Sequence, residues 1–263
     1  MGVRINTNVE ALNAQRNLSL SATAFGKSVE KLSSGLRINR ASDDAAGLSI
    51  SEKLRAQVKG LNQAQRNSQD AISMVQTAEG ALNEVHSSLQ RIRELAVQYA
   101  NGTLTGADQN AITAEGSQLQ AGITDVINQT AFNGQALLTG ATGGSAGVNF
   151  QTGADAGQLL HVSFAAVSVS AASVTSISTV DTAIATISTS RAAFGAAQNR
   201  LESNVRNLGV ASENTSASES RIRDVDVAAE MVNFTKLQIL QQAGTAILAQ
   251  ANQAPQTVLS LLR

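Results

Sequence analysis

Residues that could carry out catalysis or bind a metal are few in this sequence, and they lie far apart. The two histidines are His86 and His161, and no HExxH motif accompanies either of them. A protein zinc site takes three or four ligands, which two separate histidines do not supply. The chain has no cysteine, which excludes disulfides, thiolate metal sites and thiol nucleophiles. We therefore interpret both histidines as solvated residues without a chemical role.

Asp43 and Asp44 form a carboxylate pair that could suggest acid–base chemistry. Adjacent side chains point in different directions, however, and aspartates before an apolar run are typical of a helix start, where they accept backbone N–H groups and complement the helix dipole. The helix could begin at Ser42, or a capping box of Ser49 and Glu52 could reinforce it. No glycine motif for nucleotide phosphates is present. The sequence thus predicts no catalytic residue, no cofactor and no metal.

The elements on either side of this aspartate pair are predicted to be long helices. Apolar residues recur at intervals of three and four from Ile5 to Leu36, which predicts a helix over about 5–33 that ends at a left-handed cap. A heptad pattern from Leu54 to Tyr99, with polar residues at several seam positions, predicts a second helix of about 50 residues. The segment between them, SSGLRINRASDDAAGLSIS (33–51), is predicted to be a joint. Its key residues are Gly35, Ser42, Asp43, Asp44 and Gly47.

The rest of the chain predicts further helices around a small β region. A shorter helix is expected over about 105–128, before the turn signal at Asn133-Gly134. Residues 134–180 are rich in Gly, Ser, Thr and Ala and contain short alternating runs, which predict a β-hairpin. Helical spacing returns from about Val180 to Leu208 and again from Ile222 to the C-terminus, where Pro255 should kink or restart the last helix.

These elements predict a mainly α protein. We expect a long antiparallel helical hairpin, or coiled-coil rod, with a small central β-hairpin and with the terminal helices paired. The expected domains are residues 1–42 with 221–263, residues 43–140 with 185–220, and a small β-hairpin and loop region at 141–184.

The composition favours a protein that packs against copies of itself. Aromatic residues make up 3% and charged residues 15%, so Leu, Ile, Val and Ala must form the core while neutral polar side chains cover much of the surface. Such a surface costs less to bury than a charged one. The net charge of −1 gives no sign of a nucleic-acid partner, and no apolar run is long enough for membrane insertion. The start, MGVRINTNVEALNAQ, lacks the apolar core of a signal peptide, so we do not expect Sec export with a cleaved signal.

Four stretches at the two ends of the chain closely resemble bacterial flagellins. They are INTNVEALNAQRNL (5–18), SVEKLSSGLRINRASDDAAGLSISEKLRAQVKGLNQAQRNSQDAISMVQTAEGALNEV (28–85), LQRIRELAVQYANGT (89–103) and ILAQANQAPQTVLSLLR (247–263). The resemblance covers about 1–140 and 185–263. It implies a structural subunit of the flagellar filament for swimming motility, not an enzyme, secreted by type III export to the extracellular bacterial flagellum. In such a filament, paired terminal helices form the inner tube and the middle of the subunit forms the outer tube.

The resemblance also implies partners and sites. Arg91, Leu95 and Glu115 match positions bound by the Toll-like receptor for flagellin, on a surface that would also contact the next subunit along the axis. The C-terminal helix resembles the segment held by a flagellin export chaperone. Besides copies of the chain itself, hook-associated and cap proteins are further implied partners. The apolar residues of the assembly and chaperone segment are Ile247, Leu248, Val258, Leu259, Leu261 and Leu262.

Two other classes of protein remain open. A hook-filament junction protein has terminal helices of this kind but does not polymerise indefinitely. An intracellular coiled-coil scaffold would explain the heptads, but not a layout of short helix, break and long helix that is repeated in reverse at the other end of the chain. Electron microscopy of the purified protein after seeding distinguishes the three.

Overall fold

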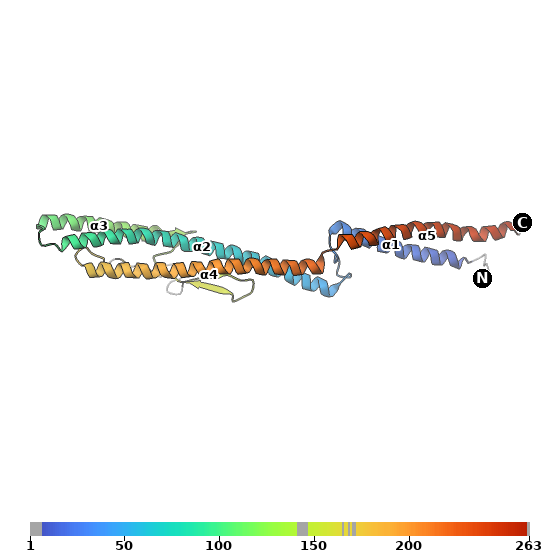
Figure 1. Cartoon of the computed structure of the whole chain (residues 1–263), viewed down its shortest axis with the longest axis horizontal. Helices are drawn as coiled ribbons and strands as arrows, with labels where there is room; N and C mark the ends of the chain where they lie inside the picture. Colours follow the sequence, from blue (N-terminus) through green and yellow to red (C-terminus); the bar gives the residue numbers. More distant parts are fainter. Residues whose placement is uncertain (1–6, 141–146, 165, 168, 170–171, 262–263) are drawn as a thin grey trace. The chain divides into compact units, whose positions relative to one another are not determined.

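The computed structural model describes residues 7–140, 147–164, 166–167, 169 and 172–261, except for the side chains of 254–261. Helices dominate this part of the chain (Figure 1) and confirm the expected mainly α fold. The helices are α1 (Val9–Ser34), α2 (Ala45–Tyr99), α3 (Gly106–Gln129), α4 (Ile177–Arg223) and α5 (Val227–Leu261). The strands are β1 (Ala131–Phe132), β2 (Gln135–Ala136), β3 (Val148–Gln151) and β4 (Leu159–Val162).

The contacts divide the chain into two compact units. Unit 1 comprises the described residues up to Ala56 and from Thr215 onward, and unit 2 comprises Gln57–Asn214. These boundaries fall within α2 and α4, whereas the sequence placed the corresponding boundaries at 42/43 and 220/221. The first turns of α2 and the last turns of α4 therefore belong with the terminal helices.

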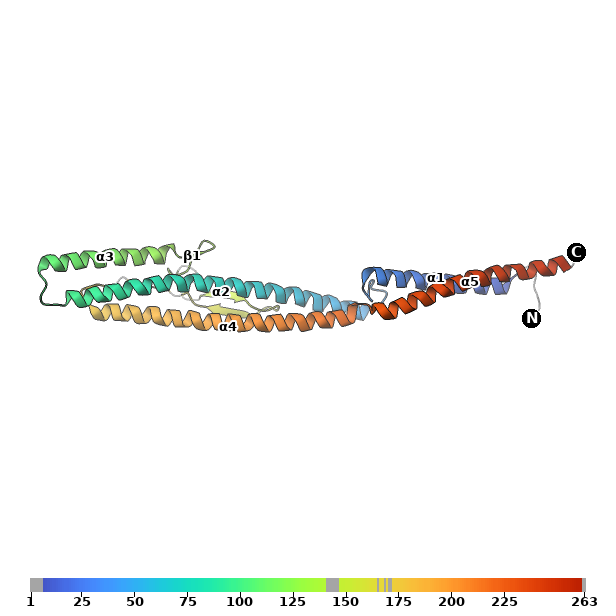
Figure 2. The same cartoon turned by 45° about the horizontal axis from the view of Figure 1, so that its top comes forward.

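In unit 1 the terminal helices α1 and α5 lie side by side in opposite directions, as expected (Figure 2). Phe25 of α1 stacks on Phe234 of α5, with ring centroids 5.0 Å apart. Helix α1 begins later than the expected residue 5, because Asn8 caps it by accepting the N–H of Ala11. Helix α5 runs on past Pro255 to Leu261, so of the kink or restart expected at this proline, the restart does not occur.

In unit 2 three helices pack around a mainly aliphatic core, which also contains Phe164 and Phe194. Parts of α2 and α4 run antiparallel, since Arg93 pairs with Asp181 while Ser212 donates to Asn62. The buried residues of α4 repeat every seven positions, which is the spacing of a coiled-coil seam. These residues are Val180, Ile187, Phe194, Leu201 and Leu208. Helix α3 adds Ile112, Ile123 and Ile127 to the core.

Helix α4 corrects the expected layout of the second half of the chain. It is continuous from Ile177 to Arg223, whereas the sequence suggested an interruption between Leu208 and Ile222. The segment 209–220 is rich in Ser and also contains Glu, Asn and Thr, and ordinary polar residues cost a helix little, so the loss of apolar spacing did not mean loss of helix. The break comes after Arg223, and α5 starts where Asp226 accepts the N–H groups of Ala228 and Ala229.

The β region consists of two short antiparallel pairs in unit 2. β3 pairs with β4 in the register Val148↔Val162, which confirms the expected hairpin. β1 pairs with β2 through a two-residue turn, and its residues Asn133 and Gly134 have φ values of 49° and 77°, as a type I′ turn requires. The sequence marked this turn but not the strands beside it.

Two asparagine side chains attach the β3–β4 hairpin to the helices. The Nδ2 atom of Asn67 on α2 donates to the carbonyl of Gln151 at 3.1 Å, and Nδ2 of Asn204 on α4 donates to the carbonyl of Thr152 at 2.8 Å. The same Asn204 amide lies 3.4 Å from the hydroxyl of the buried Ser68. Backbone carbonyls of the hairpin thus supply acceptors for polar residues along the helical seam.

Candidate functional site at the joint and the terminal helices

The connection between α1 and α2 starts at Gly35, which ends α1 in the left-handed conformation. Its φ is 73°, and its N–H donates to the carbonyl of Lys31 at 2.9 Å. An L-residue with a side chain is strained at this φ, whereas glycine is not. The expected left-handed cap is therefore present.

This connection pairs with the connection between α4 and α5. Leu36 forms an antiparallel bridge with Asp224, in which the N–H of Arg37 donates to the carbonyl of Arg223 at 2.7 Å and the N–H of Val225 donates to the carbonyl of Gly35 at 3.0 Å. The Arg37 guanidinium also donates to the carbonyl of Ile222. Backbone hydrogen bonds thereby hold the α1–α2 connection and the α4–α5 connection of unit 1 to each other.

The two aspartates of the joint have different roles. Asp44 caps α2 by accepting the N–H of Gly47 at 2.8 Å, so α2 begins at Ala45. Ser49 lies inside α2, and Glu52 pairs with Arg223 at 2.8 Å instead of turning back to a cap. The expected capping box was therefore wrong, and neither Ser42 nor Asp43 occupies the capping position that Asp44 fills.

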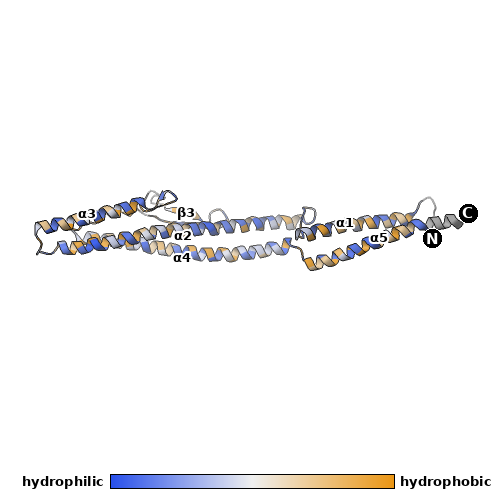
Figure 3. Cartoon of the chain, turned by 90° about the horizontal axis from the view of Figure 1, so that it is seen from above, coloured by the Kyte–Doolittle hydropathy of each residue, from blue (hydrophilic) through white to orange (hydrophobic). Residues whose placement is uncertain are grey.

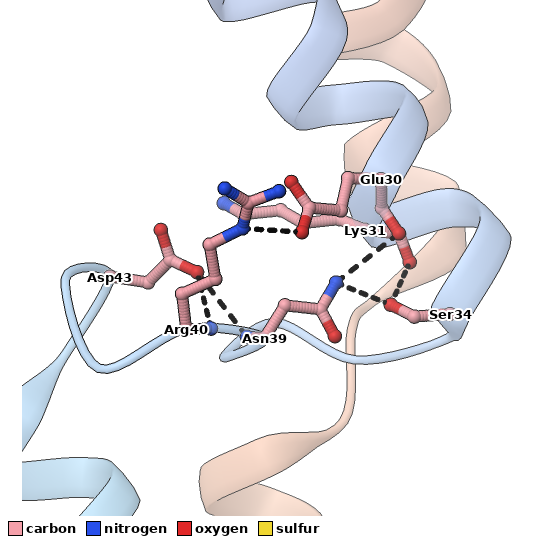
Figure 4. Close-up of polar contacts among 6 residues, drawn as sticks. All are labelled: Glu30, Lys31, Ser34, Asn39, Arg40 and Asp43. Carbon is pink, nitrogen blue, oxygen red and sulfur yellow. Dashed lines mark hydrogen bonds and ion pairs between the residues drawn. The ribbon is translucent and has the colours of Figure 1, made fainter.

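Asp43 closes the turn that precedes α2 (Figure 4). Its carboxylate accepts the N–H of Arg40 at 3.0 Å and that of Asn39 at 3.3 Å. The bond from the Arg40 backbone holds the pKa of Asp43 below its ordinary value. The Arg40 side chain reaches back to Glu30 of α1 at 2.8 Å, and this hydrogen bond raises the pKa of Arg40.

Asn39 ties the same turn to the end of α1. Its Nδ2 atom donates to the carbonyl of Glu30 at 3.2 Å and to the hydroxyl of Ser34 at 2.7 Å (Figure 4). Next to it Ile38 is 1% exposed, and it lies against Gly47: a β-carbon added at Gly47 would be 2.8 Å from Ile38 Cδ1 and 2.8 Å from Asp44 Cγ. The turn is thus packed and hydrogen-bonded along its length, in contrast to a free linker.

The helix pair α1 and α5 exposes large apolar side chains to solvent. Orange, apolar residues recur along both helices in Figure 3. On α5, Val232 is 70% exposed and Ile247 is 59% exposed. The large apolar side chains left exposed on the two helices are Val9, Leu12, Leu20 and Val29 on α1, and Val227, Met231, Val232, Ile239, Leu240 and Ile247 on α5.

Two of the three residues matched to receptor contact lie at the surface of unit 2. The Arg91 guanidinium on α2 donates to Glu115 on α3 through Nε at 3.0 Å and Nη2 at 2.8 Å, and these bonds raise the pKa of Arg91. Arg91 also donates to Glu94 at 2.9 Å. Leu95, in contrast, is 1% exposed and packs in the core, so it supports the helix that presents Arg91.

The remaining predicted residues are scattered over several elements. Ile247 is exposed on α5 and Leu248 lies in a shallow hollow beside Asn8, whereas Val258, Leu259 and Leu261 belong to the part of α5 without described side chains, and Leu262 lies outside the described residues. His86 lies on α2 beside Gln90, and His161 lies on β4. No group of His, Asp and Glu suited to hold a metal occurs among the described residues. None of the described helices is long and apolar enough to cross a membrane.

Sequence reasoning missed one half of the joint. The segment from Arg223 to Asp226 supplies the backbone partners of Gly35 and Arg37 and the cap of α5. A signal was present, because the aspartates of RDVD stand before an apolar run, as Asp43 and Asp44 do.

Two family models match the chain. The one described as the bacterial flagellin N-terminal helical region matches residues 5–143, and the one described as the bacterial flagellin C-terminal helical region matches residues 177–262.

Individual proteins are similar over nearly the whole length. A flagellin of Halalkalibacterium halodurans is 50% identical, over 98% of this chain and 99% of that protein. A flagellin of Bacillus subtilis is 47% identical, over 99% of this chain and 100% of that protein. A flagellar filament 33 kDa core protein of Treponema phagedenis is 47% identical, over 98% and 99%. Among solved structures, a Bacillus cereus flagellin matches with a TM-score of 0.50 and 32% identity, over 54% of this chain and 88% of that one.

Proposed function

Because the chain belongs to the bacterial flagellin family, we propose that it is a structural subunit of the flagellar filament and assembles with copies of itself. The family is one of structural proteins, and the flagellar filament is extracellular. A relative that matches over nearly its full length is named a flagellar filament core protein.

The observation that carries this proposal is the exposed apolar surface of α1 and α5. Phe25 and Phe234 are only half-buried where the two helices meet, and no apolar side chain described on α1 or α5 is fully buried, so both helices have apolar area left for another surface. Exposed apolar residues in such number on a two-helix pair mark an interaction surface. Because most of these side chains are aliphatic and uncharged, other copies of the same helices can cover them without burying charge.

The same helices are the proposed contact of other flagellar proteins. We assign the export chaperone to the C-terminal part of α5, since Ile247 offers an exposed apolar side chain there. Hook-associated and cap proteins would meet the same terminal helices at the ends of a filament. Export without a cleaved signal is part of this proposal.

A second proposed partner is the Toll-like receptor for flagellin, at the surface of α2 and α3. The feature that favours it is the exposed ion pair between Arg91 on α2 and Glu115 on α3. Two hydrogen bonds from the Arg91 guanidinium to Glu115 hold this guanidinium in position across the two helices. Since Leu95 is buried, direct contact is assigned to Arg91 and Glu115.

A hook-filament junction protein and an intracellular scaffold are the alternatives. The flagellin proposal is preferred because two relatives named flagellin match from end to end, with 99% and 100% of their length covered. Polymers that stop at a few subunits would favour the junction protein.

Seeded assembly of Val232 variants tests the proposal. We expect the unaltered chain to elongate filaments under the electron microscope, Val232→Asp to block elongation, and Val232→Ile to retain it. Val232 is 70% exposed, so the change to Asp should leave the helical circular dichroism of the monomer intact. Filaments of normal length and yield from Val232→Asp would contradict the assigned surface, and absence of filaments from the unaltered chain would contradict the function.

A further inference from the structure

Pro255 leaves one backbone acceptor of α5 without its ordinary helical donor. In an α-helix the N–H of residue 255 would donate to the carbonyl of residue 251, but proline has no N–H. α5 nevertheless continues across this position to Leu261. The half-buried carbonyl of Ala251 is therefore available to a donor from outside the helix.

That donor comes from α1. The Nδ2 atom of Asn8 donates to the carbonyl of Ala251 at 2.6 Å, while Oδ1 of the same side chain accepts the N–H of Ala11 at 3.1 Å. The orientation of the amide is fixed by these partners, because a flipped amide would place oxygen against a carbonyl and nitrogen against an N–H group. One side chain thus caps α1 and supplies the bond that Pro255 removes from α5.

We propose that Asn8, Ala251 and Pro255 form a register lock, which sets the position of α1 along α5. Similar aliphatic residues in a seam distinguish one register from the next only weakly, whereas the Phe25–Phe234 stack and a polar contact each fit a single register. The acceptor of this lock exists at one position only, because Pro255 is the one proline of the chain. A shift of either helix would separate Asn8 from the Ala251 carbonyl and lose this hydrogen bond.

A second polar contact agrees with the same register. The buried hydroxyl of Ser28 donates to the Glu230 carboxylate near the other end of the pair. Between the two contacts, a β-carbon added at Gly244 would lie 3.8 Å from the β-carbon of Leu18. All three pairs belong to unit 1 and are satisfied by one antiparallel alignment of α1 and α5.

A disulfide between α1 and α5 can report this alignment. The chain has no cysteine, and the 3.8 Å separation matches the usual distance between β-carbons in a disulfide, so Leu18→Cys with Gly244→Cys forms a bond only when the helices are in register. The rate of its formation under a mild oxidant is measured in the monomer and in the assembled protein. Because the bond lies within one chain, its formation can be measured whether or not filaments form. Failure of the proposed function is detected separately, by the seeded assembly of filaments.

The variants separate the lock from the helix cap. Asn8→Asp and Asn8→Ser keep a good capping oxygen but remove the donor to Ala251, and Asp places a second oxygen against that carbonyl. We expect both to slow disulfide formation about fivefold, the change that corresponds to one net hydrogen bond, with Asp at least as slow as Ser. Pro255→Ala restores the N–H, so in that background Asn8→Ser should slow the reaction less than twofold.

Three outcomes would overturn the proposal. In the first, Asn8→Asp cross-links as fast as the unaltered reporter, which would show that Asn8 serves only as a cap. In the second, Asn8→Ser slows disulfide formation equally with and without Pro255, which would show that Asn8 and Pro255 act independently. In the third, the reporter cross-links in neither the monomer nor the assembled protein, which would show that α1 and α5 do not adopt this alignment.

Discussion

Gly47 offers a sharp test of the packing at the joint, because the same substitution has opposite consequences elsewhere in α2. A β-carbon at Gly47 would lie 2.8 Å from Asp44 Cγ and 2.8 Å from Cδ1 of the buried Ile38. A β-carbon at Gly80, also inside α2, would meet nothing within 4 Å. Gly80→Ala is therefore the matched control for Gly47→Ala.

The expected magnitudes rest on these distances. Both substitutions gain roughly 0.5–1 kcal/mol of helix propensity. At Gly47 the methyl group must also push the Asp44 carboxylate off its capping position, which costs about 1 kcal/mol, and crowd Ile38, which costs about 1–3 kcal/mol. The net expectation is a loss of about 1–3.5 kcal/mol for Gly47→Ala and a gain of about 0.5–1 kcal/mol for Gly80→Ala.

Amide hydrogen exchange measures both effects locally. Exchange at residues 48–52 should quicken in Gly47→Ala, and exchange around residue 80 should slow in Gly80→Ala. Ile38→Val removes the methyl group that Gly47→Ala would strike, so the double variant should lose less than the sum of its single changes. If Gly47→Ala slows exchange as Gly80→Ala does, the joint is loosely packed and the reasoning fails.

Three further predictions concern the cap at Gly35, the turn closed by Asp43 and the exposed ion pair of Arg91. Gly35→Val should destabilise unit 1 by about 1–2 kcal/mol through strain at positive φ alone, since nothing lies within 4 Å of the new β-carbon, and urea unfolding of the variant measures this loss. Asp43 has a lowered pKa, so its contribution to stability is present above its unfolded pKa of about 3.8 and is lost as the pH falls through the lower folded value; Asp43→Asn should therefore weaken the acid dependence of thermal unfolding below pH 4. Arg91→Ala should leave the melting temperature nearly unchanged, because the ion pair with Glu115 is about half exposed, yet reduce signalling through the flagellin receptor.

The parts of the fold that could be predicted are those with local causes. The cap at Gly35 followed from glycine at the end of an apolar stripe, and the Asn133-Gly134 turn followed from the two residues that best tolerate positive φ. Ser49 with Glu52 satisfied an equally local rule and was misleading. Asp44 already caps α2 by accepting the N–H of Gly47, and Glu52 pairs instead with Arg223, which is distant in sequence.

The parts that could not be predicted depend on partners distant in sequence. The bridge between Leu36 and Asp224 uses backbone groups, which every residue carries, so no pattern of side chains predicts it. Asn8 and Ala251 likewise stand at opposite ends of the chain. Pro255 predicts a break when it is considered alone, but the effect of a missing N–H depends on whether another segment can supply a donor.

The asparagines on α2 and α4 show how such distant partners change an interpretation. In the sequence, the neutral polar side chains of the surface favoured contact with neighbouring copies. In the structure, Asn67 and Asn204 use their amides to hold the carbonyls of Gln151 and Thr152, which are consecutive residues at the end of β3. Both acceptors are backbone atoms, so the attachment does not depend on which side chains the hairpin carries. The central segment can therefore vary in sequence while the helices beneath it keep the polar residues that fix its position.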